Sequence, residues 1–312
     1  MKYFFIVGCP RSGTTWLQLM LAQHPAVATT QETHLFSAYL ACLQAAWERH
    51  RQTPRRIGLQ AVFTEEEFRT ACVDFATQVM EGIARSNRAA KVVLEKTPSH
   101  VHHVPLILQM FPDAYFIHLV RDARAAVASL CAAGRSWGRA WASPDPLDNA
   151  RVWVRDVSAG RAIADLTEHH VTVKYEALLG PMGGQILGDL FGRMGLEVDD
   201  EFCQGVLRQC GINRLRSKGD RLNARAIVDN DPAGFYRKGN TDSWAEELSP
   251  QDVRVVEYIA GDLMHEYGYT TVAESGRNHK KPWRLRRREL LTSIEWRVNR
   301  TIGALFHKSH QA

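Results

Sequence analysis

Four short apolar runs, separated by stretches with helical spacing, constrain the fold of this chain more than any other feature. The runs are compact and rich in β-branched and aromatic residues, and they comprise Tyr3–Val7, Val92–Glu95, Tyr115–Val120 and Val171–Tyr175. Runs of this kind are typical of parallel strands that are covered by helices on both faces. The alternation of strands and helices predicts a single three-layer α/β/α domain around a parallel sheet of four or five strands.

Helix-start signals lie between and after these runs. Thr64 is followed three residues later by Glu67, which predicts a capping box at the start of a helix. Asp-Pro and Ser-Pro pairs predict two further starts, because proline suits the first turn of a helix. The predicted helices comprise Thr14–His24, Thr64–Ser86, one from Asp145-Pro146 towards Glu168 and one from Ser249-Pro250 towards Tyr267. Two long segments, 134–148 and 213–244, are predicted to be loops of the kind that often carry function.

The positive charge of the chain is concentrated at its C-terminal end. The net charge is +5, but residues 277–312 contain ten Lys and Arg against two Glu, so residues 1–276 are close to neutral, at −3. We therefore divide the chain into a main domain, 1–276, and a basic tail, 277–312, and we expect no nucleic-acid partner. Apolar residues recur every four positions from Leu290 to Ile302, which predicts an amphipathic helix in the tail. Such a helix either makes a peripheral membrane contact, packs on the main domain or pairs two chains.

The six cysteines show no C-x-x-C spacing and no accompanying histidine cluster. This pattern argues against a metal site or a disulfide framework, so we expect a reduced, cytoplasmic chain. If the tail makes the membrane contact, it places the chain peripherally at the inner membrane face. The apolar run Tyr3–Val7 is shorter than the core of a secretion signal. No stretch approaches the roughly 18 apolar residues of a membrane span.

A glycine-bounded loop, GCPRSGTTW over residues 8–16, follows the first apolar run. At a turn from strand to helix, backbone N–H groups and hydroxyls can cradle a phosphate beside the helix N-terminus. The glycine spacing is that of a nucleotide P-loop, but Thr14 stands where that motif requires lysine. This difference disfavours ordinary nucleoside triphosphate hydrolysis.

Two further groups of anion-binding residues follow along the chain. Arg121 ends the third run, at the edge of a parallel sheet where α/β proteins bind their ligands. Ser129 lies eight residues later, about two helical turns, so its hydroxyl can face the same side. The other group is Tyr236-Arg237-Lys238-Gly239, in the second long loop.

Taken in order, GCPRSGTTW, LVRDARAAVASL and YRKGNTDSW resemble the sulfotransferases that use 3′-phosphoadenosine 5′-phosphosulfate (PAPS), and Tyr175-Glu176 resembles a strand-end motif of that family. The resemblance spans roughly residues 3–269. It implies the P-loop-like sulfotransferase fold, with a catalytic domain over residues 1–276. It also implies that the glycine loop holds the 5′-phosphosulfate and that the later motifs hold the 3′-phosphate. The implied donor-binding residues are Arg11, Ser12, Gly13, Thr14, Thr15, Trp16, Arg121, Ser129, Tyr175, Arg237, Lys238 and Gly239. Of these, Trp16 is either a residue that stacks on adenine or a core residue at helical spacing.

The resemblance also bears on the catalytic base. Cytosolic small-molecule sulfotransferases carry a histidine two residues after a lysine at the end of the second strand, and Pro98 takes that position after Lys96 here. The segment around Glu32 is similar to that of the tyrosylprotein and glycan sulfotransferases, so we predict Glu32 as the base. Arg11 and Lys96 are predicted to neutralise charge that develops on the sulfuryl group and the bridging oxygen. The alternative bases are His34, His100, His102 and His103.

The implied reaction is sulfuryl transfer to an acceptor hydroxyl, or to an amine, without a metal and with release of adenosine 3′,5′-bisphosphate (PAP). The acceptor is a saccharide, a lipid, a peptide or a small molecule, and Trp137 and Trp141 either stack on it or pack internally. Two rival functions remain. One is a nucleotide-dependent kinase of P-loop type, and the other is a non-enzymatic nucleotide-binding protein held at a membrane by its tail.

Overall fold

The computed structural model describes residues 1–52, 57–217 and 241–272, together with Asn223, Ala224, Ile227, Asp229, Asp231, Pro232, 234–237, Gly239 and Pro282. Its centre is a parallel sheet in the strand order β2-β3-β1-β4-β5. The strands are β1 (Lys2–Gly8), β2 (Val27–Thr29), β3 (Val92–Lys96), β4 (Tyr115–Val120) and β5 (His170–Lys174). The predicted parallel sheet is therefore confirmed. The edge strand β2 was not predicted, because three residues are too few to show a period.

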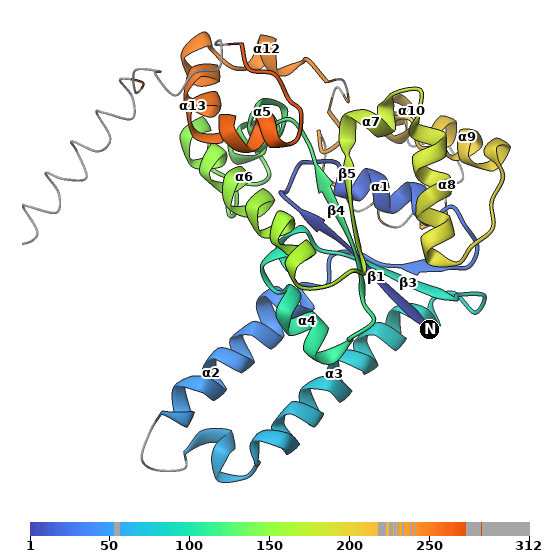
Figure 1. The fold of residues 1–312 in the computed structure, drawn as a ribbon, viewed down its shortest axis with the longest axis vertical. Helices are drawn as coiled ribbons and strands as arrows, with labels where there is room; N and C mark the ends of the chain where they lie inside the picture. Colours follow the sequence, from blue (N-terminus) through green and yellow to red (C-terminus); the bar gives the residue numbers. More distant parts are fainter. Residues whose placement is uncertain are drawn as a thin grey trace, which may run out of the picture.

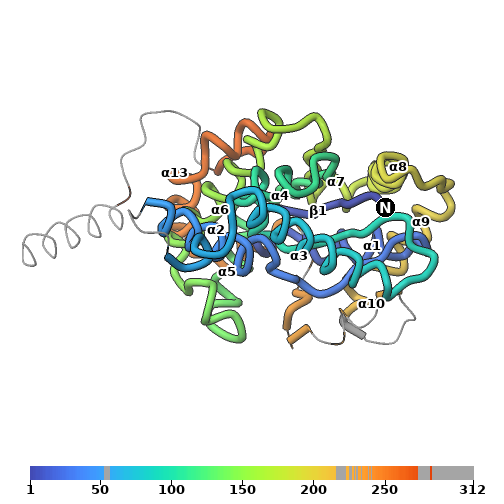
Figure 2. Tube along the Cα trace, turned by 90° about the horizontal axis from the view of Figure 1, so that it is seen from below, coloured from blue at the N-terminus to red at the C-terminus, as the bar shows by residue number. Residues whose placement is uncertain are grey.

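Helices cover both faces of the sheet (Figure 1). One face is covered by α1 (Thr14–Leu21), α7 (Tyr175–Leu179), α8 (Gly183–Met194) and α9 (Asp200–Gln209). The other is covered by α3 (Glu65–Arg85), α4 (Val104–Met110) and α6 (Pro146–Arg161), with α5 (Ala123–Gly134) and α13 (Pro250–Glu266) packed on α6. Figure 2 shows α8 and α9 at one end of the molecule and α5, α6 and α13 towards the other. The three-layer α/β/α prediction is confirmed.

The central strand β1 contributes to both cores because successive side chains of a strand point to opposite faces. Phe4 and Ile6 are buried in the core beneath α1 and α8, whereas Phe5 and Val7 are buried in the core beneath α3 and α4. A strand that is buried on both faces carries apolar residues at consecutive positions. This is why the runs read from the sequence do not alternate.

The predicted helix starts are present, and the predicted ends are less accurate. At the start of α3, Thr64 Oγ1 accepts from the Glu67 N–H and the Glu67 carboxylate accepts from the Thr64 N–H, which completes the capping box. The side chains of Asp145 and Ser249 cap α6 and α13. The predicted ends lie beyond the observed ends of α1 and α6, and a 3-10 turn, η4 (Ala162–Asp165), follows α6.

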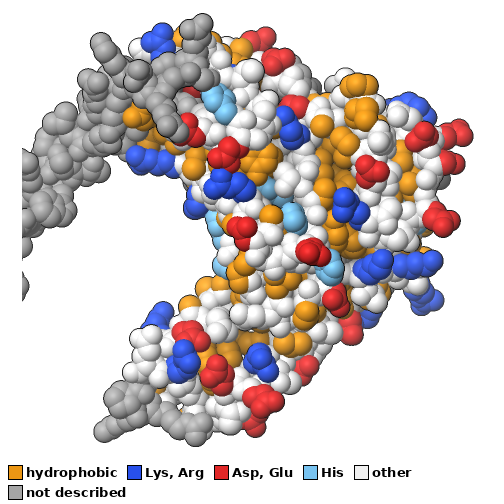
Figure 3. Space-filling view, viewed as in Figure 1, with side chains coloured by type: hydrophobic (Ala, Val, Ile, Leu, Met, Phe, Trp, Pro, Cys, Tyr) orange, Lys and Arg blue, Asp and Glu red, His pale blue; other side chains and the backbone are white. Residues whose placement is uncertain are grey.

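Between β2 and β3 the chain forms an arm that projects from the body (Figure 1). The arm comprises the π-helical η1 (Leu35–Leu40), α2 (Ala41–Arg51), the short η2 (Gly58–Ala61) and α3. Trp47 of α2 stacks on Phe68 of α3, with ring centroids 4.0 Å apart, so the two helices support each other. Charged side chains of both signs lie on the surface of the arm (Figure 3). Neither η1 nor α2 was predicted from the sequence.

Three further boundaries differ from the predictions: the end of the last strand and the limits of the two long loops. Tyr175 begins α7 instead of ending β5. The first predicted loop is reduced to residues 135–145, and α10 (Ile212–Ser217) and α12 (Trp244–Glu247) lie at the two ends of the second. The boundary at residue 276 and the predicted helix of the tail lie outside the described residues. Among the helices that are described, none is long and apolar enough to cross a membrane.

Candidate active site

A cavity of about 570 Å³ opens at the carboxyl edge of the sheet, where the loops after β1, β3 and β4 meet. Its volume lies in the range of small-molecule and cofactor sites. Eleven predicted site residues line it: Arg11, Gly13, Thr14, Thr15, Trp16, Glu32, Arg121, Ser129, Tyr175, Arg237 and Gly239. Ser12, in the loop after β1, and Lys96, at the end of β3, are both buried. Lys238 lies outside the described residues.

The loop between β1 and α1 has the geometry of an anion cradle. Gly13 is the N-cap of α1 with φ of 96°, so the first N–H groups of the helix have no intrahelical acceptor and face the cavity edge. A Cβ at Gly13 would lie 2.5 Å from the ring of Tyr175, so glycine is required there. Ser12 is fully buried, and its Oγ has no hydrogen-bond partner among the residues that are described. Ser12 Oγ is thus an unsatisfied polar atom directly between two residues, Arg11 and Gly13, that line the cavity.

Arg11 joins the glycine loop to the two later motifs. Its Nε donates to Ser129 Oγ at 3.0 Å, and its Nη2 donates to the carbonyl oxygen of Phe235 at 2.6 Å. Arg121 Nη1 donates in turn to the carbonyl oxygen of Arg11 at 3.1 Å. Burial, followed by repulsion from Arg121 and Arg237, lowers the pKa of Arg11 to about 10. The predicted convergence of Arg121 and Ser129 is present, and Arg11 is bonded to both; its role at the sulfuryl group stays a prediction.

Described residues of the second long loop contact the arginine cluster, which comprises Arg11, Arg121 and Arg237. Arg11 lies over the rings of Phe235 and Trp137, at 4.4 and 5.3 Å from their centroids. Arg237 forms an ion pair with Glu247 of α12, with 2.6 Å between Nη2 and Oε2. The hydroxyl of Tyr175 donates to the carbonyl oxygen of Gly239, which fixes the far end of the loop. Neither Phe235 nor Glu247 was predicted from the sequence.

The two other predicted catalytic residues form an ion pair. Lys96 Nζ donates to Glu32 Oε1 at 2.5 Å. The Lys96 side chain is only 2% exposed, whereas that of Glu32 is 34% exposed and reaches the cavity. A buried ammonium group requires a counter-charge, and Glu32 supplies it. Their catalytic roles stay predictions; Glu32 lines the cavity, and the buried Lys96 is bonded to its carboxylate.

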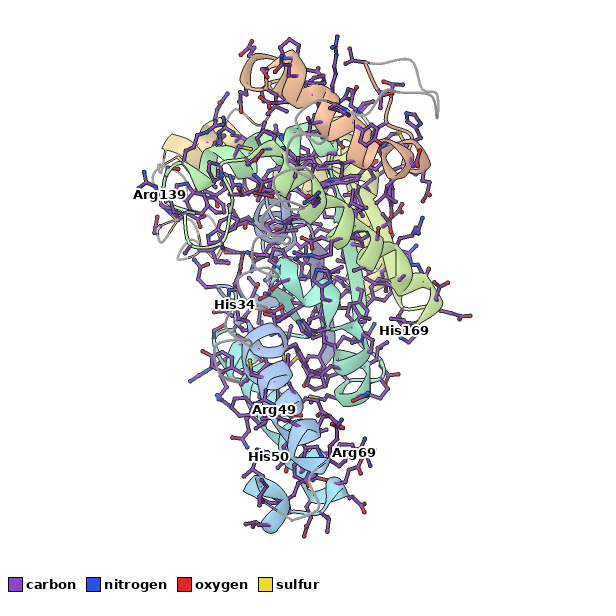
Figure 4. The ribbon with its side chains drawn as sticks, turned by 90° about the vertical axis from the view of Figure 1, so that its left-hand side faces the viewer. His34, Arg49, His50, Arg69, Arg139 and His169 are labelled. Atoms are coloured by element: carbon purple, nitrogen blue, oxygen red, sulfur yellow. The ribbon has the colours of Figure 1, made fainter. Side chains whose placement is uncertain are left out.

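The alternative bases differ in their access to the cavity. His34 lines it, and its Nε2 lies 3.5 Å from Glu32 Oε2. His100 is fully buried and bonded to Glu95, and His102 is bonded to Asp156 of α6. In Figure 4, His34 lies at the root of the arm, with Arg139 above it in the body and Arg49, His50 and Arg69 along the arm below. Of these histidines, the geometry therefore favours His34 as the alternative to Glu32.

Trp16 and Asp231 are each fixed by a hydrogen bond to another part of the structure. Trp16 is 5% exposed, and its indole N–H donates to the carbonyl oxygen of Cys210, so it is anchored in the core while it lines the cavity. Asp231 was not predicted, although it lies in the polar loop five residues before Tyr236, whose hydroxyl donates to it at 2.6 Å. Burial raises the pKa of Asp231, and the hydrogen bond from Tyr236 and the charges of Lys96 and Arg11 oppose this effect. Asp231 therefore belongs to the charged cluster of the site.

Comparison with known proteins agrees with this geometry. Residues 4–200 match the profile of the sulfotransferase family. The chain is 33% identical over 130 residues to the protein-tyrosine sulfotransferase of Drosophila melanogaster, and 35% identical over 130 residues to protein-tyrosine sulfotransferase 1 of Danio rerio. Each match covers 42% of this chain, but only 25% of the fly protein and 35% of the zebrafish protein.

Two solved structures share the fold at low sequence identity. A mouse sulfotransferase complexed with PAP superimposes with a TM-score of 0.53 at 14% identity, covering 85% of each chain. The sulfotransferase domain from the curacin biosynthetic pathway gives 0.51 at 17% identity, covering 86% of this chain and 98% of that domain. The resemblance predicted from the three ordered motifs is confirmed, and the kinase alternative is not favoured. The chain belongs to the sulfotransferase family.

Proposed function

We propose that this chain transfers the sulfuryl group of PAPS to an acceptor hydroxyl. The observation that carries the proposal is that one cavity is lined by the anion cradle, the arginine cluster and Glu32, whose carboxylate is paired with the buried Lys96. A donor with two separate phosphate positions and a reactive sulfuryl group matches this distribution. The match to the family profile over residues 4–200 supports the same reaction.

The donor would be held by this chain's own anion-binding groups. The N–H groups of Thr14 and Thr15 and the unpartnered hydroxyl of Ser12 suit the 5′-phosphosulfate. Arg121 and Ser129 suit the 3′-phosphate, since both line the cavity and both are bonded to Arg11. The lysine that a P-loop kinase uses is absent from this loop, where Thr14 takes its position.

In the proposed reaction the acceptor oxygen forms a bond to sulfur, and the bond between sulfur and the bridging oxygen of PAPS breaks. Glu32 takes the proton of the acceptor hydroxyl. Once Glu32 is neutral, its attraction for Lys96 falls, and the ammonium group becomes available to the negative charge on the leaving oxygen. Proton uptake and charge neutralisation are thus coupled through one ion pair.

We propose tyrosine in a protein or peptide as the acceptor. The relatives from fly and zebrafish are named for that acceptor, and two exposed or half-buried tryptophans offer a surface for an aromatic ring. Trp137 and Trp141 both line the cavity, with ring centroids 5.5 Å apart, and Trp141 is 51% exposed. An aromatic pair between a substrate ring and one of these tryptophans would contribute about 0.5–1.5 kcal/mol beyond the buried area.

Transfer of labelled sulfate from PAPS tests the proposal. We expect label in a tyrosine-containing peptide and none in the same peptide with phenylalanine in place of tyrosine. Calorimetry should show tighter binding of PAP than of ATP, with or without Mg²⁺. Tight binding of ATP only with Mg²⁺, and no transfer from PAPS, would favour the kinase alternative.

The cytoplasmic location and the peripheral membrane contact through residues 277–312 stay predictions. The assay for the latter is sedimentation with anionic vesicles, which should bind the full chain at low salt and release it as the salt concentration rises. A chain that ends at Gly276 should remain in the supernatant.

A further inference from the structure

We propose that Glu95 is a positioning residue for sulfuryl transfer, because its buried carboxylate fixes the turn that carries Glu32. The inference rests on the proposed function, in which Glu32 is the base. It concerns a residue on the opposite face of β3 from Lys96, away from the cavity. Glu95 has no predicted role in donor or acceptor binding.

The Glu95 carboxylate accepts hydrogen bonds from three side chains around it. Its Oε1 accepts from Thr33 Oγ1 at 2.8 Å, from the Thr33 N–H at 3.3 Å and from Thr97 Oγ1 at 2.6 Å. Its Oε2 lies 3.0 Å from Nδ1 of His100. Thr33 directly follows Glu32, so two of these bonds hold the backbone and side chain next to the base.

Each of these three partners also holds a backbone N–H at the start of η1. Thr33 Oγ1 accepts from the N–H of Leu35, Thr97 Oγ1 from that of His34, and His100 Nε2 from that of Phe36. Because Nε2 of His100 accepts, its Nδ1 carries the proton that is donated to Glu95. The carboxylate is therefore linked, through one intervening side chain in each case, to three N–H groups at the N-terminus of η1, where a negative charge is favourable.

The network is buried and charged, which makes it rigid. Glu95 is 1% exposed and His100 is fully buried. Burial alone would raise the pKa of Glu95, but its contact with His100 and the hydrogen bonds from His100, Thr97 and Thr33 lower it. The carboxylate is thus ionised under working conditions. An ionised carboxylate with all its bonds made holds its donors more strongly than a neutral acceptor.

Glu32 is held from two sides by neighbouring residues of β3. Lys96 binds its carboxylate, and Glu95 binds the residue that follows it. The turn also contains His34 with φ of 50°, a left-handed conformation that a non-glycine residue adopts only where its surroundings hold it. A base on an irregular, partly exposed turn needs such support, because a displacement of about 1 Å can lower a rate about 10²-fold.

The test compares Glu95→Gln with the wild type in the full chain. Gln keeps the shape and one acceptor oxygen, but it has no negative charge and no acceptor for His100. We expect kcat to fall more than fivefold while the dissociation constant for PAP changes less than twofold. In a Glu32→Gln background, Glu95→Gln should lower kcat less than twofold further, since a residue that acts through Glu32 has nothing left to position.

A matched pair at Thr33 keeps the test decisive if Glu95→Gln does not fold. Thr33→Val removes the hydroxyl that donates a hydrogen bond to Glu95 and should lower kcat more than fivefold. Thr33→Ser keeps this hydroxyl, so its kcat should lie within twofold of the wild type. Hydrogen exchange should show faster exchange at the N–H groups of His34, Leu35 and Phe36 in Glu95→Gln and in Thr33→Val.

Three results would overturn the proposal. The first is a Thr33→Val or Glu95→Gln variant that falls short of the fivefold loss. The second is an equal loss from Glu95→Gln with and without Glu32, which would show a general structural effect. The third is unchanged hydrogen exchange at the turn. A wild type that transfers no sulfuryl group refutes the proposed function instead, and the exchange comparison then still decides whether Glu95 holds the turn.

Discussion

Replacing Glu32 by Gln removes the proposed base with the smallest change in shape. In the wild type, Glu32 Oε1 accepts from Lys96 Nζ at 2.5 Å. The amide oxygen of Gln can accept the same hydrogen bond, so the side chain should stay in place. What changes is the charge, because Lys96 then has a neutral partner and the acceptor hydroxyl has no base.

The expected loss of stability follows from the exposure of the two side chains. Removing one partner of a fully buried ion pair costs about 3–5 kcal/mol. Here Lys96 is 2% exposed but Glu32 is 34% exposed, and the amide keeps a hydrogen bond. We therefore expect the free energy of unfolding to fall by only about 1–2 kcal/mol, since solvent screens part of the interaction. Thermal melting should show a folded variant with a slightly lower Tm.

The expected loss of turnover is larger. A positioned general base contributes typically about 10²–10⁴-fold, so kcat should fall about 10²-fold or more in Glu32→Gln. Binding of PAP, measured by calorimetry, should stay within about threefold, because the predicted donor-binding residues are unchanged in this variant. His34→Gln is the informative companion, since His34 lies 3.5 Å from Glu32. Near-normal turnover in Glu32→Gln with a large loss in His34→Gln would refute the assignment and identify the histidine as the base.

Three further predictions concern donor binding, the glycine loop and acid stability. Arg121→Ala should weaken PAP binding about tenfold or more in calorimetry, since a hydrogen bond to a charged group contributes about 1.5–3 kcal/mol; equal wild-type affinity for PAPS and adenosine 5′-phosphosulfate would contradict the 3′-phosphate role. Gly13→Ala should lower both the Tm and the affinity for PAP, because φ is 96° and the new Cβ would lie 2.5 Å from the Tyr175 ring; a variant as stable as the wild type would contradict this reading. The pKa of Glu95 is lowered from 4.5 to about 2 in the folded chain, so its ionised form stabilises the fold above pH 4.5 and this contribution, about 3 kcal/mol, is lost as the pH falls towards 2. Urea unfolding over that range should show a steeper loss in the wild type than in Glu95→Gln.

The sequence was sufficient for the sheet and for most helix starts because those features depend on local chemistry. Apolar runs identify strands that are buried on both faces, and Thr64, Asp145 and Ser249 cap helices through bonds to residues two or three positions away. The arm was missed because its support is not local. Trp47 is buried by its stack on Phe68, and nothing near Trp47 in the sequence predicts that contact.

The donor side of the site was more predictable than the catalytic side. Motifs at the ends of parallel strands must converge at one edge of the sheet, so Arg121 and Ser129 could be placed together before the structure was known. The pairing of Glu32 with Lys96 and the contribution of Asp231 depend on how two loops pack against each other. Long polar loops have no periodic pattern, so the spacing of residues in the sequence does not predict which side chains Asp231 and Glu247 contact.

The charges of the site are arranged so that a polyanionic donor relieves an existing repulsion. Arg11 is held by the hydroxyl of Ser129 and the carbonyl oxygen of Phe235, both neutral, while burial and the charges of Arg121 and Arg237 lower its pKa to about 10. A phosphate in this cluster would offset the repulsion that Arg121 and Arg237 exert on Arg11. Its negative charge would therefore raise the pKa of Arg11 again. In the proposed reaction, the charge of Lys96 is balanced by Glu32 until Glu32 accepts a proton. The arginine cluster would then be ready for negative charge before the donor binds, whereas Lys96 would become available to the leaving oxygen only as the acceptor is deprotonated.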